Sequence, residues 1–475
     1  MIMYSTIAQT LKALSDGSVT AVSLTRYYLD RIAQRADLNA FLEVFENEAL
    51  ERAAQIDSRI SAGTAGPLAG VVVGIKDVLC YQGHKVSASS RILEGFESLY
   101  TATAVQRLLD ADAIIIGRLN CDEFAMGSSN ENSAFGSVHH PLDHSKAPGG
   151  SSGGSAVAVA AGLCLVALGT DTGGSIRQPA SLCGITGMKP TYGTVSRWGC
   201  IAYASSFDQI GPMANTVDDC ARILEVIAGP DEYDATLRQQ TAPKYSEKLQ
   251  HNGKTRIAYF KQYIDSAGLD PEIRAYLIHL IEKLRADGHT VEAVDFPYLD
   301  YVIPAYYVLT TAEASSNLSR YDGVHFGYRS SNAENLEKTY KRSRSEGFGP
   351  EVKRRIMLGT FVLSSGYYDA YYSKAQKVRR KLLDYSAEIF DKYAYILIPS
   401  TPGTAFSLGG KSKDPIQMYL EDIYTVHANL CGLPAISIPA ATHSNGLPFG
   451  VQLLANTAKD ADLMAFAHRL QAAYI

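Results

Sequence analysis

Residues 149–180, GGSSGGSAVAVAAGLCLVALGTDTGGSIRQPA, decide the fold that we expect for this chain. Two glycine-rich turns are joined here by a short apolar segment, and each turn carries a serine directly after a Gly-Gly pair, Ser151 and Ser175. The apolar run at 156–169 is shorter than the roughly 18 residues that a membrane-spanning helix needs. It therefore predicts a buried helix followed by a buried strand.

Strand-like and helix-like segments alternate along the rest of the chain. Apolar, β-rich runs lie at 71–77, 113–120, 163–171, 255–260, 290–296, 394–400, 435–440 and 449–455. Residues 103–111, between the first two runs, have helical spacing. The runs are continuously apolar rather than alternating, which indicates a sheet covered by helices on both faces. The pattern therefore predicts one large α/β unit.

The chain has no clear internal repeat and no low-complexity linker, so we expect a single domain over residues 1–475. Residues 1–60 are predicted to be helical, with Ser5 as a candidate cap for a helix that ends near Gly17 and a second periodic stretch at 22–32. The segment from about 301 to 380 is rich in Tyr, Arg and Ser and contains long helical candidates. We expect it to form a helical cap or partner-facing insertion.

The composition is ordinary for a soluble globular protein, with 46% hydrophobic and 20% charged residues. A formal net charge of −5 argues against a basic nucleic-acid-binding surface over the whole chain. It leaves room for a local basic patch, such as the one at 377–381.

Seven cysteines are scattered along the chain without a CxxC pair, which indicates reduced thiols in a cytosolic protein. His139, His140 and His144 are close in sequence, but no nearby cysteine or acidic cluster completes a zinc-like set, so we expect no metal. The N-terminus contains neither a long apolar core nor an Arg-rich transit pattern. We therefore expect a cytoplasmic protein with no membrane association.

Ser175 is the candidate nucleophile of the second glycine-rich turn. It follows a strand and precedes a helix-like stretch, where a turn leaves backbone N–H groups without partners. Such donors, together with the helix dipole, suit a developing negative oxygen. A phosphate-binding loop is the competing interpretation, but the GxxxxGK[ST] motif requires a lysine where Ile176 stands.

Ser151 and Lys76 are the candidates for activating that hydroxyl. Ser151 lies in a segment that resembles a flexible Gly/Ser linker, yet it runs directly into apolar residues that must be buried. Lys76 is the penultimate residue of the run GVVVGIKD, whose apolar residues would lower the pKa of its amine. Spacing alone favours a solvent-exposed lysine paired with Asp77, and the two Gly-Gly-Ser motifs reverse that preference.

Lys76, Ser151 and Ser175, in this order and in these contexts, resemble the amidase signature family, which hydrolyses amides through a Ser–cisSer–Lys triad. The resemblance implies an α/β fold with a large, mostly parallel mixed central sheet covered by helices on both faces. It implies that Ser175 attacks the amide carbon and that Ser151 passes a proton to the neutral amine of Lys76. The peptide bond before Ser151 would be cis, and Ser152 is the alternative to Ser151 within the motif.

The same resemblance assigns the oxyanion hole to backbone N–H groups of the nucleophile loop, namely Thr172, Gly173, Gly174 and Ser175. Asp171 and Arg177 flank the nucleophile. They either brace the loop or form a simple local ion pair.

Further segments resemble the family of glutaminase subunits of tRNA-dependent amidotransferases. These segments are 126–136, 186–199, 204–213, 313–327, 347–379 and 419–437. The resemblance implies that the chain binds no cofactor and releases ammonia from L-glutamine within a heterotrimer with B and C subunits. The B subunit would use ATP and Mg to amidate misacylated Glu-tRNA(Gln), and Asp-tRNA(Asn) where the cell supplies it, and would make most contacts with the tRNA.

By position in that family, Arg355 is expected to bind the α-carboxylate of glutamine, Asp422 its ammonium group, and Tyr306 to line the pocket. A guanidinium and a carboxylate would together select a free amino acid. Without the resemblance, Arg355 would be a solvated helix charge and Asp422 an N-cap or surface acid. Tyr307 and Arg354 are the alternatives one position away.

Three other functions compete with this hypothesis. A stand-alone amidase for small aliphatic or aryl amides would share the triad but would be favoured by apolar residues at 355 and 422. A catalytically silent scaffold of a tRNA-binding assembly is disfavoured because all three triad residues are present. A nucleotide-binding protein is disfavoured because the glycine-rich loops lack a lysine.

Overall fold

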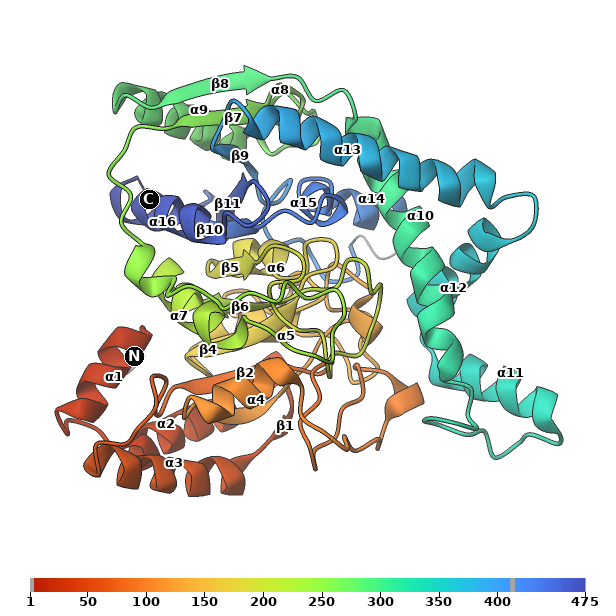
Figure 1. Ribbon diagram of the computed structural model, residues 1–475. Helices are drawn as coiled ribbons and strands as arrows, with labels where there is room; N and C mark the ends of the chain where they lie inside the picture. The colour runs from red at the N-terminus through yellow and green to blue at the C-terminus, as the bar shows by residue number, and fades with distance from the viewer. Residues whose placement is uncertain (1–3, 411–414, 475) are drawn as a thin grey trace.

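An 11-stranded sheet runs through the molecule from one end to the other (Figure 1). The computed structural model describes residues 4–410 and 415–474. The strands lie side by side in the order β1-β3-β2-β4-β6-β5-β10-β11-β9-β7-β8. Their bounds are β1 Phe41–Val44, β2 Val72–Lys76, β3 Ile114–Leu119, β4 Val166–Thr170, β5 Thr186–Lys189, β6 Ile210–Ala214, β7 Arg256–Phe260, β8 Thr290–Val294, β9 Tyr395–Pro399, β10 Ala435–Thr442 and β11 Pro448–Ala455.

The sheet is mixed, as predicted, but it is not mostly parallel. Parallel pairing joins β2 to β3 and β4, and β7 to β8 and β9. The other six neighbouring pairs are antiparallel. The prediction of a mostly parallel sheet was wrong because a strand buried on both faces is continuously apolar whichever way its neighbours run.

Helices cover both faces of the sheet. The crossovers β2–α4–β3 and β3–α5–β4 run in opposite directions along the sheet, and right-handed crossovers then put α4 and α5 on opposite faces. The α-helices are α1 Ile7–Ser15, α2 Ala21–Gln34, α3 Glu46–Ser61, α4 Thr103–Asp110, α5 Gly153–Ala160, α6 Arg177–Cys183, α7 Val217–Ile227, α8 Lys261–Ile264, α9 Pro271–Ala286, α10 Leu299–Asn317, α11 Leu336–Gly347, α12 Pro350–Leu363, α13 Lys374–Phe390, α14 Pro415–Leu420, α15 Val426–Leu430 and α16 Asp460–Ala473.

The N-terminal helices lie at the end of the sheet that carries β1 (Figure 1). Helices α1 and α2 confirm the predicted periodicity, but the first is capped by Thr6, whose side chain accepts the Gln9 N–H, rather than by Ser5. The short edge strand β1 was not predicted, because only four residues pair there and all of them are partly exposed.

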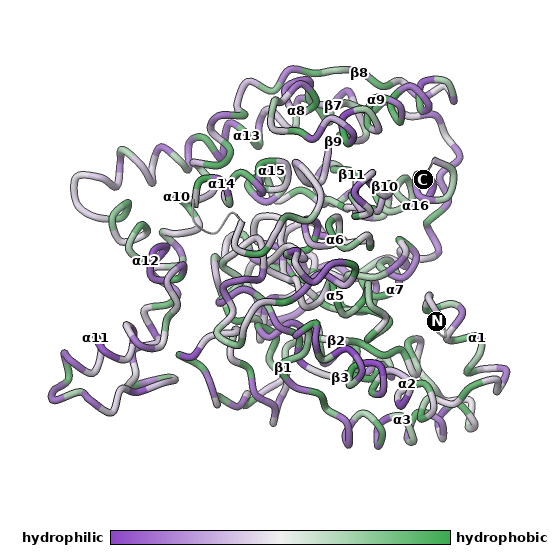
Figure 2. Tube along the Cα trace, turned by 180° about the vertical axis from the view of Figure 1, so that it is seen from behind, coloured by the Kyte–Doolittle hydropathy of each residue, from purple (hydrophilic) through white to green (hydrophobic). Residues whose placement is uncertain are grey.

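Helices α10 to α13 form an arm to one side of the sheet (Figure 1). Helices α10, α11, α12 and the start of α13 thus lie in the segment from about 301 to 380, whereas residues 321–335 within it are not helical. Helix α11 at the far end is largely hydrophilic along its trace (Figure 2). Helix α10, in contrast, buries much of its surface and packs on α12 and α13. The arm therefore has one end in solvent and one end inside the molecule.

All seven cysteines are unpaired, and every one except Cys200 is buried. Within residues 4–410 and 415–474, no helix has both the length and the apolar character required to cross a membrane. The same residues contain no group of three or more His, Cys, Asp or Glu side chains placed to hold a metal ion.

Candidate active site

The carboxyl ends of strands β2 and β4 lie next to the two glycine-rich turns. They lie where the order of strands in the sheet changes direction along the chain. Strand β2 lies between its parallel neighbours β3 and β4, and the chain passes first to one neighbour and then to the other. Such a switch point leaves a crevice at the carboxyl ends of the strands. Lys76 is the last residue of β2, and Thr170 is the last residue of β4.

Lys76 is fully buried and surrounded by hydroxyl groups rather than by carboxylates. Its Nζ lies 2.8 Å from Ser151 Oγ, 2.9 Å from Ser152 Oγ and 2.8 Å from Thr170 Oγ1. No described carboxylate forms an ion pair with it, and burial lowers the pKa of its amine. The contact with Ser151 is the one predicted from the sequence, whereas Thr170 was not anticipated.

The protons of these hydroxyls can be partly assigned. Ser152 Oγ donates to the Thr170 carbonyl at 3.1 Å and accepts the Thr170 N–H at 3.2 Å. Since its proton is already engaged, Ser152 accepts a hydrogen bond from Lys76. Ser151 has no such competing acceptor among the described residues, which favours Ser151 over Ser152 as the proton carrier.

The two glycine-rich turns are tied together by their backbones. The Ser152 N–H donates to the Ser175 carbonyl at 3.2 Å, and the Gly150–Ser151 peptide bond is cis, as predicted. Ser175 is 8% exposed, which makes it the most accessible of the three candidate catalytic residues. Its Oγ forms no hydrogen bond with a described residue, so the Lys76–Ser151 contact is present and the Ser151–Ser175 contact is not.

Asp122 supports the first turn and was missed in the sequence. Its carboxylate accepts the N–H groups of Asn130 at 2.9 Å and Asn132 at 3.1 Å, and its own N–H donates to the Ser151 carbonyl. A Cβ atom at Gly150 would lie only 2.1 Å from its Oδ2. The turn can approach this carboxylate only because residue 150 is glycine.

The nucleophile loop offers three free backbone donors. The N–H groups of Thr172, Gly173 and Ser175 donate to no described residue, whereas the Gly174 N–H donates to Asp171 Oδ1 at 2.8 Å. Gly174 was predicted to belong to the oxyanion hole, but its N–H is already satisfied. The structure therefore leaves Thr172, Gly173 and Ser175 as the available donors.

Asp171 and Arg177 brace this loop rather than forming a simple surface pair. Both are fully buried, and Arg177 Nε and Nη2 each lie 2.9 Å from an oxygen of Asp171. Arg177 also donates to the Thr425 carbonyl and to Asn429 Oδ1. Burial alone would raise the pKa of Asp171, but the guanidinium lowers it to about 2. The ionised pair thus fastens the loop to the C-terminal part of the chain.

Arg355 lies on the inner side of α12, where it is 3% exposed. Its Nε donates to Glu351 Oε1 at 2.8 Å and its Nη1 to Tyr203 Oη at 2.9 Å, while Nη2 donates to no described residue. The alternative, Arg354, is half-exposed and pairs with the outer side of Glu351. A cavity of about 140 Å³ is lined by both Arg354 and Arg355. The deep burial of Arg355 therefore favours it over the half-exposed Arg354 as a binding residue.

Asp422 and two tyrosines of α10, Tyr306 and Tyr307, also border the site. Both oxygens of Asp422 lie 2.9 Å from Ser128 Oγ, and Tyr307 Oη donates to Oδ2 at 3.0 Å. Burial raises the pKa of Asp422 to about 7. Tyr306 points at the nucleophile loop, since a Cβ atom on Gly173 would lie 2.3 Å from its hydroxyl. Both neighbouring tyrosines thus face the site, with Tyr306 next to the loop and Tyr307 bonded to Asp422.

Comparison with known proteins agrees with this arrangement. The Amidase family matches residues 23–464. The chain is 51% identical to the A subunit of glutamyl-tRNA(Gln) amidotransferase from Ruthia magnifica subsp. Calyptogena magnifica, over 98% of this chain and 96% of the relative. It is 49% identical to the protein of that name from Chlorobium phaeobacteroides, over 98% and 99% of the two chains.

A solved structure supports the same grouping. The crystal structure of the A subunit of glutamyl-tRNA(Gln) amidotransferase from Thermotoga maritima superposes with a TM-score of 0.79 at 40% identity, over 95% of this chain and 92% of that one. Sequence and fold therefore agree over nearly the whole length of the chain. The chain belongs to the amidase signature family and, within it, to the A subunits of glutamyl-tRNA(Gln) amidotransferase.

Proposed function

We propose that this chain hydrolyses L-glutamine with Ser175 as nucleophile, Ser151 as proton carrier and Lys76 as base. The observation that carries the proposal is the surrounding of Lys76. Three hydroxyl oxygens lie within 2.9 Å of a fully buried amine that has no ion pair with a described residue. A neutral amine has a lone pair to accept a proton, and the resulting ammonium has one N–H for each of the three oxygens.

The reaction then follows from this geometry. The Ser151 hydroxyl gives its proton to Lys76 and takes one from Ser175, which attacks the amide carbon. The developing oxyanion is stabilised by the free N–H groups of Thr172, Gly173 and Ser175. The ammonium form of Lys76 returns the proton through Ser151 to the leaving nitrogen, so that ammonia departs. Water then hydrolyses the acyl-enzyme by the same proton path.

Two charged residues would select glutamine, Arg355 of the helical arm and Asp422 of the C-terminal segment. The unengaged Nη2 of Arg355 supplies N–H donors for the α-carboxylate, and the free lone pairs of Asp422 accept the α-ammonium group. Tyr306 lies between these charges and the nucleophile loop, where it lines the path of the side-chain amide. A neutral amide would leave Nη2 of Arg355 and the remaining lone pairs of Asp422 unused.

The ammonia is proposed to pass to a second protein of the same complex, which amidates Glu-tRNA(Gln). The names of the relatives support this, since each is the A subunit of an enzyme that acts on that aminoacyl-tRNA. The working assembly would be a heterotrimer with B and C subunits. ATP and Mg would be used by the B subunit, which would also make most of the contacts with the tRNA.

Ammonia release by the chain, purified with whatever co-elutes from its host, tests the proposal. L-Glutamine is compared with butanamide, which has the same side chain without the α-amino and α-carboxylate groups. We expect strong preference for glutamine because only the free amino acid carries the carboxylate and ammonium groups that Arg355 and Asp422 would bind. Equal or better turnover of butanamide would support the alternative, a stand-alone amidase for small amides. Absence of turnover with both amides would contradict the proposed triad.

A further inference from the structure

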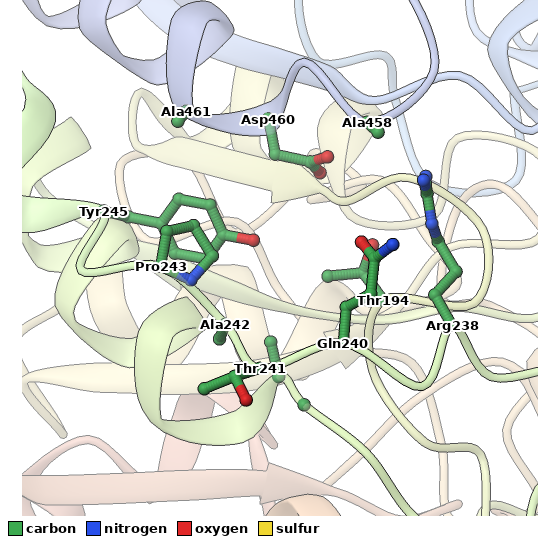
Figure 3. A pocket seen from close by; sticks show the side chains of 12 residues that line it. Thr194, Arg238, Gln240, Thr241, Ala242, Pro243, Tyr245, Ala458, Asp460 and Ala461 are labelled. Carbon is green, nitrogen blue, oxygen red and sulfur yellow. The ribbon is translucent and has the colours of Figure 1, made fainter.

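A second polar cavity lies between α7, α16 and the loops around residues 194 and 240, away from the residues of the candidate active site (Figure 3). Its volume is about 180 Å³, enough for a small metabolite. Half of the residues that line it are polar (Figure 3), namely Thr194, Arg238, Gln240, Thr241, Tyr245 and Asp460. None of these residues has a part in the proposed glutaminase reaction.

Tyr245 directs an unpaired hydroxyl into this cavity. The residue is only 5% exposed, yet its hydroxyl bonds to no described residue, and Figure 3 shows it pointing toward the space between Gln240 and Asp460. Burial raises the pKa of Tyr245, so the hydroxyl remains a hydrogen-bond donor at neutral pH. The hydroxyl oxygen itself is not among the fully buried side-chain atoms without a partner, so it is open to the cavity and can donate a hydrogen bond to a molecule there.

The cavity also carries two opposite charges that do not neutralise each other. The Arg238 guanidinium and the Gln240 amide make no hydrogen bond or ion pair with a described residue. Asp460 is 4% exposed and accepts the N–H and hydroxyl of Thr191 at 2.7 and 2.6 Å. Each carboxylate oxygen keeps a second lone pair for a further donor. Both charges are thus positioned on one cavity without contact between them.

This separation restricts the chemistry of a ligand. A simple anion would be attracted by Arg238 and repelled by Asp460, and a simple cation would meet the reverse. A molecule that carries both charges satisfies both side chains. It also supplies acceptors for Tyr245 and Gln240 through its anionic group.

We propose that this cavity binds a free α-amino acid, with its carboxylate toward Arg238 and its ammonium group toward Asp460. The side chain would extend through the open part of the cavity, so the site would recognise the common backbone of amino acids rather than glutamine alone. The inference rests on the contents of this cavity and is independent of the proposed glutaminase function.

Saturation-transfer NMR of the full chain, in whatever complex it is purified, tests the proposal with three small probes. Glycine carries both charges, acetate only the negative one and methylammonium only the positive one. We expect glycine to bind with a Kd on the order of 1 mM and each single-charge probe to bind about tenfold more weakly or worse. Binding of acetate as tight as that of glycine, or no glycine binding up to about 20 mM, would overturn the proposal.

Substitutions of the lining residues test whether the glycine that is detected by saturation transfer binds in this cavity. Arg238→Gln removes a charge whose guanidinium makes no protein contact, so the fold should persist and glycine binding should weaken at least about tenfold. Tyr245→Phe should weaken it by a few-fold. Glycine also carries the two groups assigned to Arg355 and Asp422, so the comparison is repeated in an Arg355→Lys background, where Arg238→Gln should still weaken the remaining glycine binding. Loss of binding in Arg355→Lys but not in Arg238→Gln would assign the glycine to the active site and overturn the proposal.

Discussion

The catalytic edge of the sheet and the charged groups that face it are built in different ways. Around Lys76 the partners are neutral hydroxyls from the turns and strand ends between residues 151 and 170, held at 2.8–2.9 Å. Around Asp422 and Arg355 the partners are charges, tyrosines and a serine, and the Ser128–Asp422 contact spans 294 residues. One region surrounds a buried amine with neutral hydroxyls, and the other holds charged side chains in place.

The largest effect on glutamine hydrolysis is expected from Ser175→Ala. This substitution should stop the chemistry around Lys76 and leave the binding of glutamine by Arg355 and Asp422 intact. Removing the nucleophile should lower kcat for glutamine hydrolysis about 10⁴-fold or more. Glutamine binding, measured by equilibrium dialysis, should persist because Arg355 and Asp422 are untouched. Amidation driven by added ammonia should also persist in the assembled complex. Loss of both activities would mean that Ser175 has a structural role instead.

The next effect is expected in the charged region, from Arg355→Lys. Lysine keeps the positive charge beside Glu351 but loses the planar set of donors that Tyr203 and a carboxylate would share. We expect kcat/KM for glutamine to fall about 100-fold, equivalent to about 2.7 kcal/mol, mainly through KM. Steady-state kinetics measures this split.

Arg354→Lys is the matched control for that substitution. Its side chain is half-exposed on the same helix and should tolerate the change within about twofold. A fall in kcat with KM unchanged in Arg355→Lys, or an equal defect in Arg354→Lys, would contradict the assignment of Arg355 to the substrate carboxylate.

Much of the fold could be predicted from the sequence because hydrophobic runs mark buried strands. All eight predicted strand segments contain an observed strand. The missing strands include β5 and β6, which are short and contain Gly or Pro, residues that weaken a strand signal. Strand direction could not be predicted, since burial on both faces removes the alternation that distinguishes antiparallel sheets.

Some residues of the candidate site could likewise be predicted from the sequence, and others could not. Ser151 and Ser175 could be predicted because each follows a Gly-Gly pair, whereas Lys76 could be predicted only because those two motifs accompany it in the chain. Thr170 and Asp122 could not, because a polar residue at the end of a strand has no signature until its neighbours are known. The partners of Arg355 and Asp422 come from distant parts of the chain, so only the fold brings them together.

Thr170→Val tests whether the catalytic edge works through its neutral hydroxyls. The ammonium of Lys76 formed during proton transfer would lose one of its three acceptors, and a hydrogen bond to a charged group contributes about 2 kcal/mol. We therefore expect kcat to fall about 30-fold with KM unchanged. Thr25→Val, which removes a buried hydroxyl bonded only within α2, should leave both constants unaltered. An unchanged kcat in Thr170→Val would remove Thr170 from the mechanism.

The smallest effect is expected in the pH dependence of the kinetic constants. Titration of Asp422 should appear in kcat/KM, and titration of Lys76 should appear in kcat. Asp422 has a pKa of about 7 in the free chain because of burial, so below pH 7 it is increasingly neutral and cannot pair with the substrate ammonium group. We expect kcat/KM to fall about tenfold per pH unit in this range.

Once glutamine is bound, its ammonium group should keep Asp422 ionised. The fall below pH 7 that is expected in kcat/KM, the limb near pH 7, should therefore be absent from the pH profile of kcat. The acid limb of kcat should then report only protonation of Lys76, whose pKa is lowered by burial. Asp422→Asn should raise KM at all pH values and remove the limb near pH 7 from kcat/KM, while the limb in kcat stays. If the limb near pH 7 survives in Asp422→Asn, then another group titrates there, and the division between a neutral catalytic edge and a charged recognition region fails at Asp422.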